Sequence, residues 1–179
     1  LILLTRIKNS TSVKIEFDNK KKANSFVSYD SNFSEEEYAL KIKEDIIEIR
    51  ASDYSGVLYA FEYLHQLLLI SENENKILPI ISIKDSPRFK YRGFLLDASR
   101  NFYGINKVKQ VIDYMTHFKL NKLDFRLTDD EGWRLEIPGI PELTQIGSKR
   151  GFTKDETDKL IPMYGSGAFS DNSGSGFYT

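Results

Sequence analysis

The sequence predicts a small α+β domain followed by a βαβ unit with a parallel sheet. Segments before residue 50 alternate apolar and polar residues, as half-buried strands do. A stripe of apolar residues at helical spacing then follows. Beyond residue 87 the pattern becomes strand, helix and strand within a short stretch of chain, which is typical of two parallel strands joined by a helix.

Four segments in the first half of the chain have the pattern of strands. Residues 11–17 place three apolar side chains on one face. Residues 38–42 and 46–50 repeat this alternation on either side of a short charged segment, which predicts a β-hairpin. Residues 77–83 form a further apolar strand, and Pro79 places it near a sheet edge or at a strand start.

Two amphipathic helices are predicted. Residues 54–70 carry apolar side chains at the i, i+3, i+4 spacing, and Asp53 precedes them as the expected N-cap. Residues 105–119 show the same spacing, with Asn106 as the expected N-cap. The apolar stripe of this second helix is expected to face inward; it consists of Ile105, Val108, Val111, Ile112, Met115 and Phe118.

A domain boundary is predicted at the segment Asp85-Ser86-Pro87-Arg88. Pro87 has no amide hydrogen and restricts Ser86 to extended geometry, so regular structure should break there. We therefore expect one domain over residues 1–86 and another over residues 87–179.

The second domain begins with the predicted βαβ unit. Residues 93–97 are continuously apolar until Asp97, like a strand that is buried on both faces. Residues 120–127 form the next strand, after the helix over residues 105–119. The two strands are therefore expected to be parallel. The glycine-rich segment 164–176 is expected to be a surface loop.

Composition excludes several classes of protein. The 179 residues include 25 Lys and Arg against 26 Asp and Glu, so the net charge of −1 provides no field that would attract nucleic acid or anionic lipid. There is no cysteine and there are two histidines, which excludes a thiolate zinc site and a three-histidine metal site. The longest apolar run, residues 67–70, is far too short to span a bilayer. We expect no metal, no cofactor, no nucleic acid and no membrane insertion.

Charged residues follow both strands of the predicted βαβ unit. Parallel strands end at the same edge of a sheet, where α/β folds bind ligands. The residues that we expect at this edge are Asp97, Ser99 and Arg100 after the first strand, and Asp129, Asp130, Glu131, Trp133 and Arg134 after the second. Two interpretations remain open: a ligand site, or a loop that salt bridges and a helix cap hold in place.

Two of these positions suit a polar ligand. Arg100 has a planar fork of five N–H donors that fits sugar hydroxyls or a carboxylate. The adjacent carboxylates of Asp129 and Asp130 can orient a base, accept hydroxyl hydrogens or help to hold a cation. Trp133 is expected to anchor its loop rather than to form a sugar platform.

Separate segments of the sequence resemble the family 20 glycoside hydrolases, the β-N-acetylhexosaminidases, and occur in the order found in that family. The resemblance covers residues 37–179. The segments that carry it are residues 49–60, similar to the helix entry of the small domain before the barrel; residues 87–100, similar to the entry into the catalytic barrel; and residues 119–122, 127–137 and 141–148, similar to the motif of the second barrel strand.

The resemblance implies a fold and a reaction. Residues 87–179 would be the first βαβ portion of a (β/α)₈ TIM barrel that is cut off after its second strand, because a complete barrel needs about 250 residues. Family members cleave terminal N-acetylglucosamine or N-acetylgalactosamine with retention, using the 2-acetamido oxygen of the substrate as nucleophile. An Asp–Glu pair assists them. No position here matches that pair, so it is expected beyond Thr179, and the chain alone is expected to be inactive.

The resemblance also implies roles for individual residues. Arg100 corresponds to the arginine that binds hydroxyls of the terminal sugar. Asp129 corresponds to the aspartate that supports the acid/base Glu through a histidine further along the chain, and Asp130 is grouped with it as a supporting residue. No catalytic residue is expected within this chain. Asp124 and Arg126 depart from the family pattern, because many members have histidine at both positions.

The expected partners are glycans that contain N-acetylhexosamine, and the resemblance points to a periplasmic or extracellular compartment. The alternative from another class is a non-catalytic carbohydrate-binding or interaction module. The reading frame beyond Thr179 separates the two, because an Asp–Glu pair after a predicted strand favours the enzyme and a stop codon favours the binding module.

Overall fold

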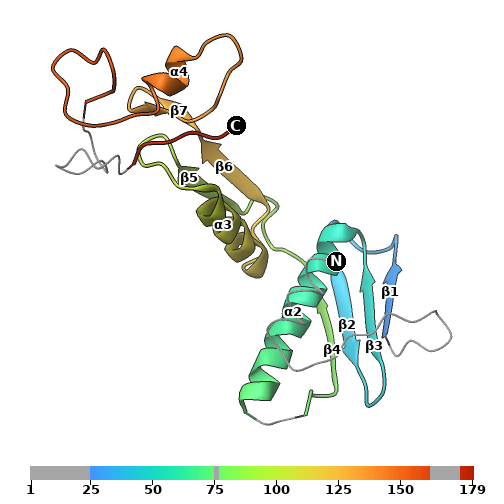
Figure 1. Ribbon diagram of the computed structural model, residues 1–179. Helices are drawn as coiled ribbons and strands as arrows, with labels where there is room; N and C mark the ends of the chain where they lie inside the picture. Colours follow the sequence, from blue (N-terminus) through green and yellow to red (C-terminus); the bar gives the residue numbers. More distant parts are fainter. Residues whose placement is uncertain (1–24, 75–76, 162–173) are drawn as a thin grey trace. The chain divides into compact units, whose positions relative to one another are not determined.

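The computed structural model describes residues 25–74, 77–161 and 174–179 (Figure 1). It divides the chain into two compact units, of which the first ends at Lys90 and the second begins at Tyr91. The strand predicted over residues 11–17 lies outside the described residues, as does most of the glycine-rich segment.

The described residues of the first unit contain a four-stranded sheet. Its strands are β1 (Ser25–Tyr29), β2 (Tyr38–Ile42), β3 (Ile47–Ala51) and β4 (Ile81–Asp85), in the order β1-β3-β2-β4. β2 and β3 are antiparallel neighbours, which confirms the predicted hairpin. β1 pairs parallel with β3, and β4 pairs antiparallel with β2.

Two strands of this sheet differ from the sequence expectation. β1 was not predicted, because the exposed sequence Ser-Phe-Val-Ser-Tyr has no alternation of apolar and polar residues. β4 begins at Ile81 rather than at residue 77 and is an edge strand, as Pro79 predicted. A proline cannot donate a ladder hydrogen bond, so pairing begins only beyond it.

Helix α2 (Tyr54–Asn73) covers one face of this sheet (Figure 1). Asp53 is its N-cap, as predicted, and accepts a hydrogen bond from the backbone N–H of Gly56 at 2.9 Å. The helix runs to Asn73, beyond the predicted end at residue 70. The core between helix and sheet consists of Tyr38, Leu40, Ile42, Ile49, Ala51, Tyr59, Ala60, Leu64 and Leu68.

The second unit begins with a parallel βαβ unit. Strand β5 (Gly93–Asp97) pairs parallel with β6 (Lys122–Arg126), and helix α3 (Ile105–His117) connects them. This arrangement confirms the predicted topology. The hairpin of β7 (Thr128–Asp129) with β8 (Gly132–Trp133) follows β6, and the short helix α4 (Glu142–Gln145) comes after it.

Two local expectations for this unit are wrong. The N-cap of α3 is Gly104, whose ψ of 155° is extended, and Asn106 lies inside the first turn. Burial is also lower than predicted, because the described sheet has two strands and a single helix connects them. In β5 only Leu96 is buried and Leu95 is 55% exposed; in the α3 stripe only Val108 and Met115 are buried.

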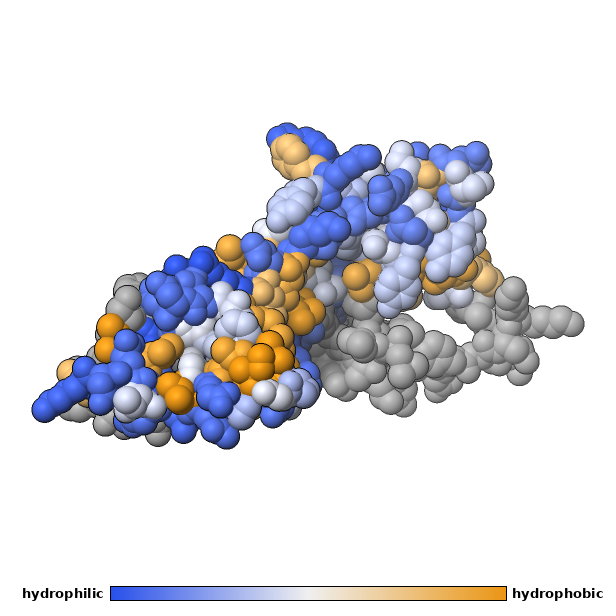
Figure 2. Space-filling model, turned by 90° about the horizontal axis from the view of Figure 1, so that it is seen from above, coloured by the Kyte–Doolittle hydropathy of each residue, from blue (hydrophilic) through white to orange (hydrophobic). Residues whose placement is uncertain are grey.

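Apolar side chains are therefore exposed on both elements. Hydrophobic patches are visible among hydrophilic residues on the face shown in Figure 2. In the second unit the exposed large hydrophobic residues of β5 and of α3 with its C-cap are Phe94, Leu95, Ile105, Ile112, Tyr114 and Phe118. Among the described helices, none has the length and apolar character required to cross a membrane.

Candidate functional site

Arg100 lies in the turn that follows β5. The backbone N–H groups of Ala98 and Ser99 both donate to the carbonyl oxygen of Arg126, at 3.0 and 3.2 Å, so this turn is joined to the end of β6. Asp97, the last residue of β5, accepts a hydrogen bond from the backbone N–H of Arg100 at 3.1 Å. Its other carboxylate oxygen lies 2.5 Å from Nη1 of Arg100. The turn and the strand end together fix the base of the Arg100 side chain.

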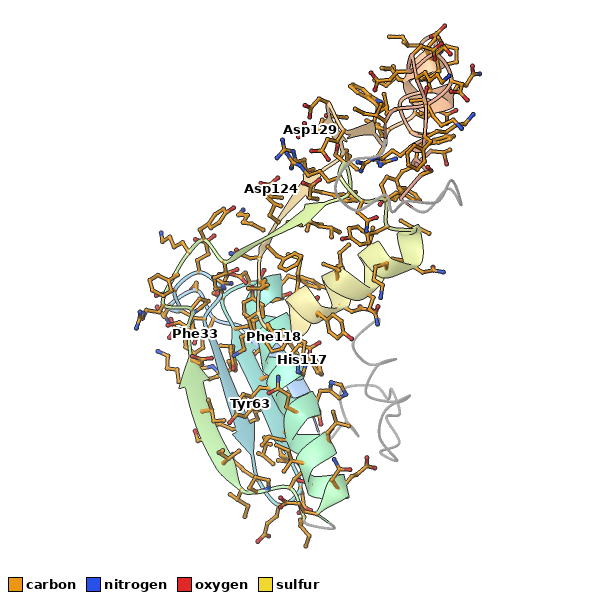
Figure 3. All side chains as sticks on the ribbon, turned by 90° about the vertical axis from the view of Figure 1, so that its left-hand side faces the viewer. Phe33, Tyr63, His117, Phe118, Asp124 and Asp129 are labelled. Atoms are coloured by element: carbon orange, nitrogen blue, oxygen red, sulfur yellow. The ribbon has the colours of Figure 1, made fainter. Side chains whose placement is uncertain are left out.

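Asp129 meets Arg100 from the end of the neighbouring strand. Oδ2 of Asp129 lies 3.4 Å from Nη2 of Arg100 and also forms an ion pair with Nη2 of Arg126. Oδ1 of Asp129 accepts the backbone N–H of Asp130 at 2.8 Å. Figure 3 shows Asp129 just beyond the end of β6, the strand that carries Asp124. The parallel strands thus bring Arg100 and Asp129 to one edge of the sheet.

A third carboxylate completes this cluster. Oε1 of Glu131 lies 3.4 Å from Nε of Arg100, and Oε2 of Glu131 lies 3.6 Å from Nη2 of Arg150. Arg150 is buried and also donates from Nη1 to the carbonyl oxygen of Arg100. Sequence reasoning missed Arg150, because it lies in a loop far beyond both strand ends and no periodic pattern or motif marks it.

The charges in this cluster shift the pKa values of its carboxyl groups. Hydrogen bonds from Asp130, together with the charges of Arg126 and Arg100, hold the pKa of Asp129 below its ordinary value. A hydrogen bond from the Asp130 side chain to that of Asp129, and the negative charge of this neighbour, raise the pKa of Asp130. Burial raises the pKa of Asp97, but hydrogen bonds from Arg100 outweigh this effect and leave it lowered. Asp129 therefore keeps its negative charge in preference to Asp130.

Asp124 and Arg126, the two positions where the resemblance leads us to expect histidine, differ in environment. Arg126 contributes its guanidinium to the Asp129 ion pair, while Asp124 is exposed on the same face of β6. Phe125, between them, points to the other face, where its ring centroid lies 5.5 Å from that of Tyr178. Arg126 thus places a fixed positive charge beside Asp129.

Trp133 and Arg134 hold the loop that carries Glu131. Nε1 of Trp133 donates to the carbonyl oxygen of Leu135, two residues further along the chain, at 2.5 Å. The backbone N–H of Trp133 donates to the carbonyl oxygen of Gly147 at 2.8 Å. Arg134 is fully buried, and its guanidinium donates only to backbone carbonyl oxygens in the hydrogen bonds described. The hydroxyl of Ser99 donates to the carbonyl oxygen of Gly132 at 2.7 Å, which joins the turn of Arg100 to this loop.

The arrangement presents a guanidinium of fixed orientation at the surface. The side chain of Arg100 is 36% exposed, and carboxylates from both strand ends contact it. A guanidinium has five N–H donors, so those directed outward can bind hydroxyl or carbonyl oxygens of a polar ligand. Within the part of the chain that the structure describes, no group of three or more His, Cys, Asp or Glu residues is arranged to hold a metal ion.

Comparison with protein families matches nearly all of the sequence. Residues 89–179 match the model described as glycosyl hydrolase family 20, catalytic domain, and residues 3–86 match the model for domain 2 of the same family. The N,N'-diacetylchitobiase of Vibrio harveyi is 47% identical over 142 residues, which cover 79% of this chain and 16% of that protein. A β-hexosaminidase of Vibrio vulnificus is 40% identical over 150 residues, covering 84% of this chain and 17% of the relative.

Solved structures show the same similarity. The complex of a family 20 exo-β-N-acetylglucosaminidase from Vibrio harveyi with N-acetylglucosamine superposes with a TM-score of 0.82 at 35% identity, covering 98% of this chain and 26% of that one. A β-N-acetylhexosaminidase from Bacteroides fragilis superposes with a TM-score of 0.74 at 26% identity, covering 89% of this chain and 33% of that one. The chain thus spans a third or less of each of these proteins.

Proposed function

This chain belongs to glycosyl hydrolase family 20, and from this premise we propose that the complete protein containing it is a β-N-acetylhexosaminidase. Its substrates are glycans that end in β-linked N-acetylglucosamine or N-acetylgalactosamine. It cleaves the terminal sugar with retention, and the 2-acetamido oxygen of the substrate attacks the anomeric carbon. Within this chain, Arg100 binds the terminal sugar and the carboxylates around Arg100 keep its guanidinium in place.

The meeting of Arg100 with Asp129 is the observation that carries this proposal. Their side chains come from the ends of two parallel strands and lie 3.4 Å apart. Ligands of α/β barrels bind at this end of the strands. In the proposed site, Arg100 donates hydrogen bonds to hydroxyls of the terminal sugar, and the carboxylates of Asp97, Asp129 and Glu131 keep its guanidinium in place.

Asp129 and Asp130 have a supporting role in this proposal. The carboxylate of Asp129, ionised at neutral pH, orients a histidine from a later part of the protein, and that histidine supports the acid/base Glu. The catalytic Asp–Glu pair matches no position of this sequence and lies in the part of the complete protein beyond Thr179. The βαβ unit of β5, α3 and β6 is then the start of a (β/α)₈ barrel, after a small domain over residues 1–86.

Hydrolysis of fluorogenic glycosides by the complete protein tests the proposed activity. We expect turnover of the β-N-acetylglucosaminide and the β-N-acetylgalactosaminide, but not of the β-glucoside, which has no acetamido group. A 2-trifluoroacetamido substrate should react much more slowly, because fluorine withdraws electrons from the attacking oxygen. The sugar product should have the β configuration when first released, as NMR can measure. The chain of residues 1–179 alone should show no turnover.

Three results would contradict the proposal. Cleavage of the β-glucoside at a similar rate would show that the acetamido group is not required. Release of the α-anomer would exclude retention. Binding of N-acetylglucosamine by the complete protein without any turnover would favour the non-catalytic carbohydrate-binding module instead.

A further inference from the structure

Arg134 binds the backbone immediately before Arg100. Nε of Arg134 donates to the carbonyl oxygen of Ala98 at 2.9 Å, and Nη2 donates to that of Ser99 at 2.8 Å. These two peptide groups form the turn between the end of β5 and Arg100. A rotation of either carbonyl would redirect the Arg100 side chain, and Arg134 donates to both of them.

The remaining donors of Arg134 bind two later segments of the chain. Nη1 donates to the carbonyl oxygens of Ser148 and Gly176, at 2.7 and 3.2 Å, and Nη2 also donates to that of Gly174 at 2.8 Å. A guanidinium has five N–H groups. All of them are therefore used, and each is directed at a backbone carbonyl. The Arg100 turn is thereby connected to two segments that are distant from it in sequence.

Burial of the Arg134 guanidinium has a free-energy cost. Arg134 is fully buried, and burial together with the positive charge of Arg150 lowers the pKa of Arg134 to about 10. A buried cation without a carboxylate partner is unfavourable unless hydrogen bonds satisfy it fully. An apolar side chain could fill the same space without that cost, but it could not fix the directions of carbonyl groups.

A second buried arginine binds the next carbonyl along the turn. Nη1 of Arg150 donates to the carbonyl oxygen of Arg100 itself, and the Arg150 side chain is buried. The consecutive carbonyls of Ala98, Ser99 and Arg100 are therefore all held by buried guanidinium groups. The turn is fixed from its interior side, while the Arg100 side chain extends to the carboxylates at the strand ends.

We propose that Arg134 is a positioning residue for the sugar-binding arginine: by holding the carbonyls of Ala98 and Ser99 it presets the orientation of the Arg100 guanidinium. The proposal rests on the proposed function for its kinetic consequence, but not for its structural one. Lysine cannot replace arginine here, because an ammonium group has three N–H donors on one nitrogen and cannot reach carbonyls spread around a planar fork.

The first test is steady-state kinetics of the complete protein with Arg134→Lys. Arg100 contacts the sugar in both the ground state and the transition state, so loss of its orientation should raise KM about tenfold to a hundredfold and change kcat less. The Arg100→Lys variant should raise KM in the same way. In the double variant, Arg134→Lys should add little to the increase of KM caused by Arg100→Lys, because both substitutions remove the same interaction between Arg100 and the sugar.

Val108→Ala is the control for loss of stability. Val108 is a buried residue of α3 whose apolar side chain takes no part in the hydrogen bonds of the Arg100 turn, so this variant should unfold at a lower temperature with an unchanged KM. Hydrogen exchange provides a readout that does not depend on activity. The amides of Ala98, Ser99 and Arg100 should exchange faster in Arg134→Lys than in the wild type, and they should not do so in Val108→Ala.

The outcomes separate this inference from the proposed function. An unchanged KM in Arg134→Lys would overturn the positioning role. So would a KM in the double variant that is raised by the product of the two single-variant factors. Unchanged exchange at Ala98, Ser99 and Arg100 would overturn it as well. If the wild-type protein hydrolyses no N-acetylhexosaminide, the proposed function fails, and the exchange rates still decide whether Arg134 holds the turn.

Discussion

Nη2 of Arg100 lies 3.4 Å from Oδ2 of Asp129, although the two residues follow different strands. The parallel pairing of β5 with β6 accounts for this, because both chains leave the sheet at the same edge. Nη1 of Arg100 lies 2.5 Å from Asp97 and Nε lies 3.4 Å from Glu131. Each nitrogen of the guanidinium thus faces a different carboxylate, so the group has one preferred orientation.

Arg100→Lys should therefore impair binding of the substrate. A lysine keeps the charge but cannot contact separate carboxylates and still present directed donors to a sugar. Hydrogen bonds to charged groups contribute about 1.5–3 kcal/mol each. We expect kcat/KM of the complete protein to fall about tenfold to a hundredfold on an aryl β-N-acetylglucosaminide, mostly through KM.

Arg88→Lys is the matched control for this substitution. Arg88 is exposed, its guanidinium lies over the ring of Phe89, and it belongs to the other unit of the chain. The same chemical change there should leave kcat/KM within twofold, in keeping with the small effects of most surface substitutions. An equal loss of activity in both variants would show that Arg100 has no special part in binding.

Asp130→Asn should stabilise the second unit at neutral pH. The hydrogen bond to Asp129 and the charge of that neighbour raise the pKa of Asp130 above its ordinary value of 3.8. A carboxyl whose pKa is raised on folding favours the folded state below 3.8, and this contribution is lost as the pH rises through the folded-state pKa. The variant should unfold at a higher temperature than the wild type at neutral pH, and the difference should vanish as the pH falls toward 3.8.

Asp129→Asn should have the opposite effect. Hydrogen bonds from Asp130 and the charges of Arg126 and Arg100 lower the pKa of Asp129, so its contribution is present above 3.8 and is lost as the pH falls through the folded-state pKa. This variant should unfold at a lower temperature than the wild type at neutral pH. Thermal unfolding monitored by circular dichroism over a series of pH values measures both differences. Shifts of the same sign would refute the assignment of the charge to Asp129.

Local patterns were sufficient to predict the elements that bring the site together. Alternation identified β2 and β3, and helical spacing identified α2 and α3. A continuous apolar run identified β5, and β6 was predicted as the strand that follows α3. The edge shared by Arg100 and Asp129 then followed from the parallel topology alone. Asp53 was identified as a cap because an acidic residue directly before a helical stripe can bind the free amides of the first turn.

Features that depend on distant contacts could not be predicted in this way. Arg150 donates to the carbonyl oxygen of Arg100 from a loop whose sequence has no periodic pattern. Arg134 is fully buried, but the sequence around it contains no pattern that indicates burial. Asn106 is a good cap by residue type, but the extended residue before α3 is Gly104. β1 gave no signal because its stability comes from pairing with β3 rather than from burial of one face.

Gly132→Ala should destabilise the second unit, because Gly132 lies where two segments approach closely. A Cβ atom there would lie 2.5 Å from the carbonyl oxygen of Ser99 and 2.8 Å from Nη2 of Arg134. Both neighbours are held by further hydrogen bonds and cannot move freely. Overpacking of this kind costs about 1–3 kcal/mol, measurable as a lower midpoint in urea.

Gly104→Ala is the control for this substitution. A Cβ atom at Gly104 has no heavy atom within 4 Å, so the added methyl meets open space. The free energy of unfolding should fall by only about 0.5 kcal/mol, because alanine is a weaker N-cap residue than glycine. Equal losses for the two variants would show that the loss of glycine, rather than the close approach at Gly132, determines the stability of this unit.

Asp53 should be the most sensitive position at the start of α2. Oδ1 of Asp53 accepts the backbone N–H of Gly56 at 2.9 Å, and Oδ2 accepts the backbone N–H of Glu36 at 2.7 Å. Asp53→Ala removes both acceptors and should lower the free energy of unfolding by about 2 kcal/mol. Asp53→Asn keeps one carbonyl oxygen for the helix amide but replaces the other acceptor with an NH₂ group, so its loss should be intermediate. Urea unfolding of the three proteins measures this order. A wild-type midpoint in Asp53→Ala would mean that water satisfies both amides and that the cap does not stabilise the helix.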